Sequence, residues 1–317
     1  MSRREFFRQS AAVIAGLGLS NLQHLPLLAS IAGTTTPSTP IPARPLGRTG
    51  INVGIVSLGG EGVLRTTGRS GEAVPVIRQA LDSGITYCDT APAYQQSQDY
   101  YGEALGDRRG HIFLATKTHD RTRDGSLHLL EQSLQRLRTD HVDLWQLHDL
   151  RTMHDLDAIF GKGGAIDAVE TAKAQGMTRF AGITGHHDPH VLVEAMRRYA
   201  FDTILVALNP ADRQRLSFID TVLPEANARG MGIIGMKVLA HGTLLQPDGP
   251  LSAEEAIAYT LSLPISTVII GCSSPDEVRQ NVECARRFAP LSPETMQTIE
   301  RRTLPYAARA TFYKKPS

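Results

Sequence analysis

The sequence predicts an α/β protein, a (β/α)8 TIM barrel with an N-terminal β-hairpin that closes the bottom of the barrel. Eight short apolar segments alternate with amphipathic segments of helical period, which is typical of a parallel sheet covered by helices. The repeated units occupy about 250 residues, the usual size of such a barrel. The segment Gly59-Gly60-Glu61-Gly62 after the first expected strand lacks the spacing of a GxGxxG motif, which argues against an open doubly wound sheet.

Local patterns support each element in turn. Residues 46–53 form two short strand-like pieces around glycine-bearing turns and predict the hairpin. The first barrel strand, 56–58, is apolar and is followed by glycines, and the helix over 73–82 ends before Gly84. The same order of helix, glycine and strand recurs at Gly176 and Gly230. The other expected strands are 85–88, 112–116, 142–147, 180–184, 203–208, 232–236 and 267–271. The other expected helices are 126–138, 165–173, 190–199, 218–228, 253–263 and 275–288.

The N-terminus resembles a twin-arginine (Tat) export signal. Arg3 and Arg4 precede a mild apolar run over 11–19, and small residues at 30–32 suit a cleavage site. The run is too short for a stable membrane span. The alternative is an unprocessed amphipathic tail with an accidental pair of arginines.

Three parts of the chain follow from this interpretation. Residues 1–32 are the expected signal peptide, residues 33–45 a flexible linker rich in Thr, Pro and Ser, and residues 46–317 the barrel domain. The Tat pathway moves folded proteins that often already hold a cofactor. We therefore expect a bacterial periplasmic protein whose partner during export is the Tat translocase.

Composition excludes several classes of partner and site. The formal net charge of 317 residues is +1, so no basic field indicates nucleic acid or anionic lipid. The three cysteines, Cys88, Cys272 and Cys284, form neither a CxxC pair nor a plausible disulfide framework, and we expect Cys272 and Cys284 to be buried as small apolar residues. No spacing of iron–sulfur ligands is present.

Polar groups follow three consecutive expected strands, at the end of a barrel where chemistry occurs. Asp89 and Tyr94 follow the second strand, Lys117 ends the third and His148 ends the fourth. These types suit the reduction of a carbonyl: Tyr94 would protonate the oxygen, Lys117 would lower the pKa of that phenol, and Asp89 would keep Lys117 charged. His148 would orient the carbonyl by a hydrogen bond. Taken singly, each residue has a plainer explanation as a buried paired acid or a solvated rim group.

From residue 46 onward the chain resembles the aldo-keto reductases. The matching segments are Asp89-Thr90-Ala91-Pro92-Ala93-Tyr94, Gly102-Glu103-Ala104-Leu105-Gly106, Ala115-Thr116-Lys117, Asp143-Leu144-Trp145-Gln146-Leu147-His148 and Gly271-Cys272-Ser273-Ser274-Pro275. The resemblance implies a catalytic tetrad of Asp89, Tyr94, Lys117 and His148. It also implies an oxidoreductase that reduces a small-molecule aldehyde or ketone to an alcohol with NADP(H) or NAD(H).

The resemblance further implies which residues would contact the cofactor. These are Gly60, Thr184, Gly185, Asn209, Met236, Lys237, Leu239, Gly242, Gly271, Ser273, Glu277 and Asn281. Some depart from the family pattern: Thr184-Gly185 replaces Ser-Asn, Leu205 replaces a glutamine, and Met236 replaces a stacking aromatic. Glu277 aligns with the residue that often reads the 2′-phosphate of NADPH. A carboxylate repels phosphate but can accept from a free ribose hydroxyl, so both cofactors stay open.

Two other functions are compatible with parts of the sequence. A non-catalytic nicotinamide-binding sensor or partner subunit would bind cofactor without useful turnover. A metal-dependent hydrolase would use the imidazoles and the carboxylate in residues 185–190. Their spacing matches no metal motif, and Asp188-Pro189 fits the cap and first turn of the next helix. We therefore expect no metal, and the complete tetrad favours the enzyme over the sensor.

Overall fold

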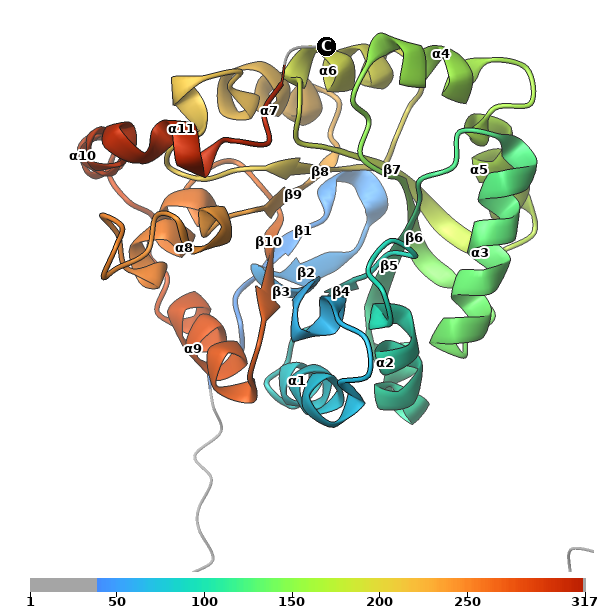
Figure 1. Ribbon diagram of the computed structural model, residues 1–317, viewed down its shortest axis with the longest axis horizontal. Coiled ribbons are helices and arrows are strands. Elements are labelled where there is room, and N and C mark those ends of the chain that lie inside the picture. Colours follow the sequence, from blue (N-terminus) through green and yellow to red (C-terminus); the bar gives the residue numbers. More distant parts are fainter. Residues whose placement is uncertain (1–38, 316–317) are drawn as a thin grey trace, which may run out of the picture. The chain divides into compact units, whose positions relative to one another are not determined.

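The computed structural model describes residues 39–315. The expected export signal and the first six residues of the expected linker lie outside this range. Eight parallel strands close into a barrel in the order β10-β3-β4-β5-β6-β7-β8-β9, which confirms the predicted fold class. Figure 1 shows the helices arranged around this barrel.

The strands and helices keep the predicted order. The barrel strands are β3 (Val56–Gly62), β4 (Tyr87–Asp89), β5 (Phe113–Thr118), β6 (Val142–Leu147), β7 (Thr178–Gly185), β8 (Thr203–Ala207), β9 (Gly232–Met236) and β10 (Thr267–Cys272). The helices are α1 (Ser70–Asp82), α2 (Ser97–Ala104), α3 (Arg123–Leu137), α4 (Met153–Phe160), α5 (Ala165–Ala174), α6 (Pro189–Arg198), α7 (Phe218–Ala228), α8 (Ala253–Leu261), α9 (Pro275–Arg286), α10 (Pro293–Thr303) and α11 (Ala307–Ala310).

The N-terminal hairpin lies at the end of the barrel where the strands begin. Strands β1 (Ala43–Pro45) and β2 (Asn52–Gly54) pair antiparallel. The buried Leu46 packs so closely on the start of β9 that a Cβ at Gly232 would lie 2.7 Å from its Cδ1. The backbone N–H of Arg48 donates to the carbonyl of Gly230 at 2.8 Å. The hairpin thus closes the barrel bottom, and it starts at Ala43, inside the segment expected to be linker.

Two apolar layers hold the barrel. The larger one lies between strands and helices, and the smaller one fills the barrel interior below the mouth. The buried members of the interior layer are Leu46, Val53, Tyr87, Phe113, Ala115, Leu144, Leu205 and Ile234. The rings of Tyr87 and Phe113 stack there with centroids 5.3 Å apart. The barrel is therefore a packed core rather than a pore, and its polar groups are concentrated at the mouth.

Strand β3 runs further than its sequence predicts. We expected it to stop at the glycines after Leu58, but it extends to Gly62, which pairs with Cys272 of β10 after a register shift. Gly62 has φ 72°, and a Cβ there would lie 2.4 Å from the carbonyl oxygen of Cys272. The glycines therefore allow close approach of two strands at the mouth instead of ending the strand.

Besides the four-residue α11, three helices have no counterpart among the predicted elements. Helix α2 follows Tyr94, α4 begins with a capping box of Thr152 and Asp155, and α10 begins at Pro293. Helices α2 and α4 have only eight residues each, a window too short for a helical pattern of apolar residues to stand out. Among the described residues, no helix is both long and apolar enough to cross a membrane. All three cysteines are free; Cys272 is buried as expected, Cys88 is also buried, and Cys284 is only half-buried.

The C-terminal segment is fixed beside the mouth. The buried ammonium of Lys314 pairs with the carboxylate of Asp212 and donates to the carbonyl of Arg215 at 2.8 Å. The ring of Tyr313 lies 5.3 Å from the ammonium of Lys237. This arrangement places Tyr313 beside Lys237, which lines the mouth.

Candidate active site

A cavity of about 910 Å³ opens at the carboxyl ends of the strands, and residues from all eight barrel strands or the loops that follow them line it. Its size is in the range of small-molecule and cofactor sites. Asp89, Tyr94, Lys117 and His148 all line this cavity. The structure therefore brings together the four groups that the sequence singles out.

A buried ion pair forms the floor of the cavity. The side chains of Lys117 and Asp89 are fully buried and pair through Nζ and Oδ1. Lys117 also donates to the carbonyl of Thr90 at 2.9 Å, and the amide of Gln146 donates to Oδ2 of Asp89 at 3.1 Å. These bonds satisfy both charges inside the barrel, which fixes the position of the ammonium.

The ring of Tyr94 lies over this ion pair. The ammonium of Lys117 is 4.8 Å from the ring centroid, and the imidazole of His148 meets the ring edge to face at 5.7 Å. The guanidinium of Arg65 lies 5.3 Å from the same centroid. A Cβ at Gly60 would be 2.5 Å from Cδ2 of Tyr94, so glycine at this position makes room for the ring.

Burial and charge set the protonation states of these groups. Burial opposes the charge of Lys117, but Asp89 and Tyr94 outweigh it and hold the pKa of Lys117 above its ordinary value. Burial raises the pKa of Tyr94, and the expected lowering by Lys117 is the smaller effect. Burial, followed by the charge of Lys117, lowers the pKa of His148 well below 6.5. At neutral pH the site thus holds an ammonium, a protonated phenol and a neutral imidazole.

A model of the Aldo/keto reductase family matches residues 51–255 of the chain. The chain belongs to this family. Over 304 residues, 83% of this aldo-keto reductase and 94% of the L-galactose dehydrogenase of Arabidopsis thaliana align with 28% identity. The D-threo-aldose 1-dehydrogenase of Pseudomonas sp. aligns with 27% identity over 68% of this chain and 83% of that protein.

Solved structures give the same assignment. The holo form of an aldo-keto reductase from Bacillus halodurans aligns with a TM-score of 0.70 and 27% identity, covering 82% of this chain and 96% of that one. The protein is therefore an NAD(P)-dependent oxidoreductase.

Most of the residues implied for cofactor binding line the same cavity as the tetrad. These are Gly60, Thr184, Met236, Lys237, Leu239, Gly242, Gly271 and Ser273. Gly242 has φ 82° and no heavy atom within 4 Å of the place of a Cβ, so its backbone is open to a ligand. A nicotinamide dinucleotide fits this set, because an apolar wall at Met236 and Leu239 adjoins the cation of Lys237 and exposed backbone.

Four of the implied residues do not line the cavity. The Asn209 amide donates to the hydroxyl of Tyr313 at 3.0 Å, and Gly185 lies so close to Leu192 that a Cβ would be 2.8 Å away. Glu277 accepts from the backbone N–H of Ser273 at 2.7 Å, and Asn281 donates to the sulfur of Cys272 at 3.4 Å. These contacts lie in the walls of the site, and contact of the four residues with cofactor stays a prediction.

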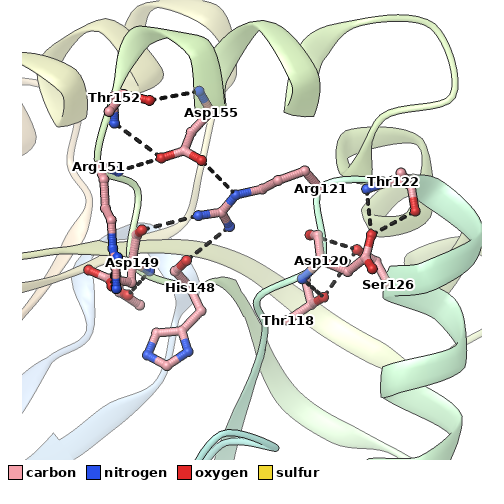
Figure 2. Close-up of polar contacts among 11 residues, drawn as sticks. Thr118, Asp120, Arg121, Thr122, Ser126, His148, Asp149, Arg151, Thr152 and Asp155 are labelled. Atoms are coloured by element: carbon pink, nitrogen blue, oxygen red, sulfur yellow. Dashed lines mark hydrogen bonds and ion pairs between the residues drawn. The ribbon is translucent and has the colours of Figure 1, made fainter. Parts of the chain in front are cut away.

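Among the residues at the site that the sequence-based set lacked, Gln146 and Arg121 contact the tetrad directly. Gln146 lies two positions before His148, and strand alternation puts both side chains on the inner face, so a signal for it existed. Arg121 lies in the loop after β5 and has no such signal. Figure 2 shows its guanidinium between the carbonyls of His148 and Asp149, which accept at 2.9 and 3.1 Å, and the carboxylate of Asp155 at 3.2 Å.

Replacing Arg121 with glutamine is expected to lower kcat about tenfold while the cofactor Kd stays within about twofold. The hydrogen bond from Arg121 to the carbonyl of His148 would be lost, so the imidazole would be less well oriented. Steady-state kinetics and fluorescence titration of NAD(P)H measure the two quantities. Arg123→Gln is the matched control, because Arg123 is an exposed partner of Asp124 outside the cavity. An unchanged kcat in Arg121→Gln would show that this hydrogen bond does not position His148.

Proposed function

We propose that this aldo-keto reductase reduces an aldehyde or ketone to an alcohol, with Tyr94 as the proton donor. The convergence of Asp89, Tyr94, Lys117 and His148 on one cavity carries the proposal. NAD(P)H, when bound, supplies the hydride. Residues 237–242 and 271–273 at the rim would hold the dinucleotide, leaving the space over Tyr94 for the substrate carbonyl.

Each member of the tetrad has a separate task in this mechanism. The neutral imidazole of His148 donates a hydrogen bond that orients the carbonyl oxygen toward Tyr94. As negative charge develops on that oxygen, the Tyr94 hydroxyl transfers its proton to it. The ammonium of Lys117 stabilises the phenolate that this transfer leaves, and Asp89 keeps the ammonium in place.

The pH dependence of carbonyl reduction should follow the protonation of the Tyr94 phenol. Because the pKa of Tyr94 is raised above 10, the acid form persists through neutral and mildly alkaline pH. We expect kcat/KM for reduction to stay level from about pH 7 to 9.5 and to fall only above about pH 10. Initial rates in overlapping buffers of constant ionic strength measure this. An inflection well below pH 10 that is assigned to Tyr94 would mean that Lys117, and not burial, has the larger effect on the pKa of the Tyr94 phenol.

The cofactor and the substrate are tested in sequence. Fluorescence titration with NADH and NADPH gives the two Kd values, and a panel of carbonyls is then screened with the better cofactor. The panel includes aldoses assayed in the oxidative direction, because two relatives are named as dehydrogenases of L-galactose and D-threo-aldoses. Tight cofactor binding with no turnover of any substrate would favour the sensor function instead.

We also propose that residues 1–32 direct export through the Tat translocase to the periplasm, with cofactor bound beforehand. The pair Arg3 and Arg4 before an apolar run supports this. Replacing both arginines with lysine should leave the protein in the cytoplasmic fraction, whereas the unmodified chain should reach the periplasm with nicotinamide fluorescence. Periplasmic protein without bound nicotinamide would contradict loading before export.

A further inference from the structure

Two histidines and an aspartate meet beside the tetrad. Asp149 follows His148, and His186 and His187 follow β7. Nδ1 of His186 lies 3.3 Å from Oδ1 of Asp149, and Nε2 of His187 lies 3.4 Å from the same oxygen. Within residues 39–315, one potential ligand atom from each of these three side chains lies within 4.8 Å of the others. Asp149 and His186 also line the mouth cavity.

The three side chains are not held together by hydrogen bonds. Oδ1 of Asp149 and Nε2 of His187 are buried atoms that have no hydrogen-bond partner in the described part of the chain. A buried polar atom without a partner costs free energy, which indicates that something else satisfies both atoms. The two imidazole rings lie with centroids 4.5 Å apart and a 31° angle between their planes.

Neighbouring groups fix the orientation of each side chain. Nε of Arg151 donates to Oδ2 of Asp149 at 2.7 Å, which leaves Oδ1 directed at the imidazoles. The backbone N–H of Asp149 donates to the hydroxyl of Thr184 at 2.8 Å, and its carbonyl accepts from Arg121, as Figure 2 shows. The carbonyl of His187 accepts from the backbone N–H of Lys315 at 3.1 Å. Outer hydrogen bonds of this kind orient the ligands in metal sites.

We propose that Asp149, His186 and His187 bind one divalent transition-metal ion, Zn²⁺ or an ion of similar preference such as Co²⁺. Ligand atoms about 2.0–2.1 Å from a tetrahedral zinc lie about 3.3–3.4 Å from one another, which matches the two measured separations. At pH 7.5 imidazoles are mostly neutral and a carboxylate is ionised, the forms that bind a metal. Three protein ligands leave the fourth position of a tetrahedral ion for water or a substrate group.

Two cations limit the affinity of this site. Arg151 already pairs with Asp149, and Lys237 is close enough to act on His186 electrostatically. We therefore expect a Kd of about 10 µM, weaker than the binding of closed structural zinc sites. The same cations favour an anionic fourth ligand, such as hydroxide or a substrate carboxylate.

Two of the proposed ligands, His186 and His187, lie in the segment 185–190 that the sequence offered, and the carboxylate does not. Asp188 caps α6, where its side chain accepts from the N–H of His190 at 2.9 Å, as predicted for a helix start. His190 is exposed and belongs to the helix. The carboxylate comes instead from Asp149, in the loop after β6. The expectation of no metal weighed only residues 185–190 and did not include Asp149.

The test uses the full chain without a polyhistidine tag, treated with chelator and freed of nicotinamide. Isothermal titration with Zn²⁺ and the visible absorption of added Co²⁺ should show one ion per chain, with the Kd given above. His186→Ala and His187→Ala should each weaken binding by more than about tenfold. His190→Ala is the matched control and should bind like the unmodified protein.

Two results would overturn the proposal: no saturable binding by the unmodified chain, or unchanged binding in both His186→Ala and His187→Ala. Thermal melts of the chelator-treated variants establish that they are folded. Binding at the site should also raise the Tm of the unmodified chain and not that of the two variants. None of these readouts uses carbonyl turnover, so the outcome is independent of the proposed reductase activity.

Discussion

Replacing Tyr94 with phenylalanine is expected to lower kcat for carbonyl reduction by about a thousandfold or more. The phenylalanine ring keeps the contacts with Lys117 and His148 but has no proton to give to the carbonyl oxygen. The cofactor should still bind with a Kd within about twofold of the original, because no hydroxyl contact to it is invoked. Single-turnover rates with pre-bound NADPH or NADH, followed at the absorption of the reduced nicotinamide, measure the loss directly.

The control for this variant is Tyr306→Phe, which removes a hydroxyl outside the cavity lining. Tyr306→Phe should keep the original rate. Retention of a substantial rate by Tyr94→Phe with intact cofactor binding would remove Tyr94 from the role of acid. Loss of both rate and cofactor binding would instead indicate a damaged site.

Replacing Lys117 with methionine is expected to affect both stability and activity. The fully buried Asp89 would lose its partner, so the free energy of unfolding should fall by about 3–5 kcal/mol. Without the ammonium nothing stabilises the phenolate of Tyr94, and kcat should fall more than about a hundredfold. Urea unfolding followed by circular dichroism, together with steady-state rates, measures the two effects.

The double variant Asp89→Asn with Lys117→Met separates these effects. It removes both buried charges, so most of the lost stability should return while activity stays low. Recovery of activity together with stability would contradict a direct role for Lys117. A double variant as unstable as Lys117→Met would show that the ion pair is not the source of the instability.

The fold was predictable because each unit of the barrel carries its own signal. Apolar runs such as 142–147 and 203–208 become β6 and β8 with nearly the predicted bounds. The helices α2, α4, α10 and α11 were missed. Three of them, α2, α4 and α11, have eight residues or fewer, which is too short a window for a helical pattern to stand out. The extension of β3 to Gly62 depends on a contact with Cys272 of β10, which local sequence does not encode.

The site was predictable to the extent that barrel topology gathers strand ends. Lys117 lies near the end of β5, and His148 comes directly after β6. Because neighbouring strands of the barrel are parallel, these two residues are expected close to Asp89 and Tyr94. Barrel topology does not predict the contacts that loops make. Arg121 reaches the carbonyl of His148 from a loop, and its partners are defined only by the folded chain.

The most direct test of the central claim is a crystal structure of the protein with oxidised cofactor and an unreactive carbonyl or carboxylate inhibitor. We predict that the inhibitor oxygen lies about 3 Å from both the Tyr94 hydroxyl and a nitrogen of His148, beside the nicotinamide ring. An inhibitor oxygen bound elsewhere, with the nicotinamide remote from Tyr94, would contradict the proposed mechanism.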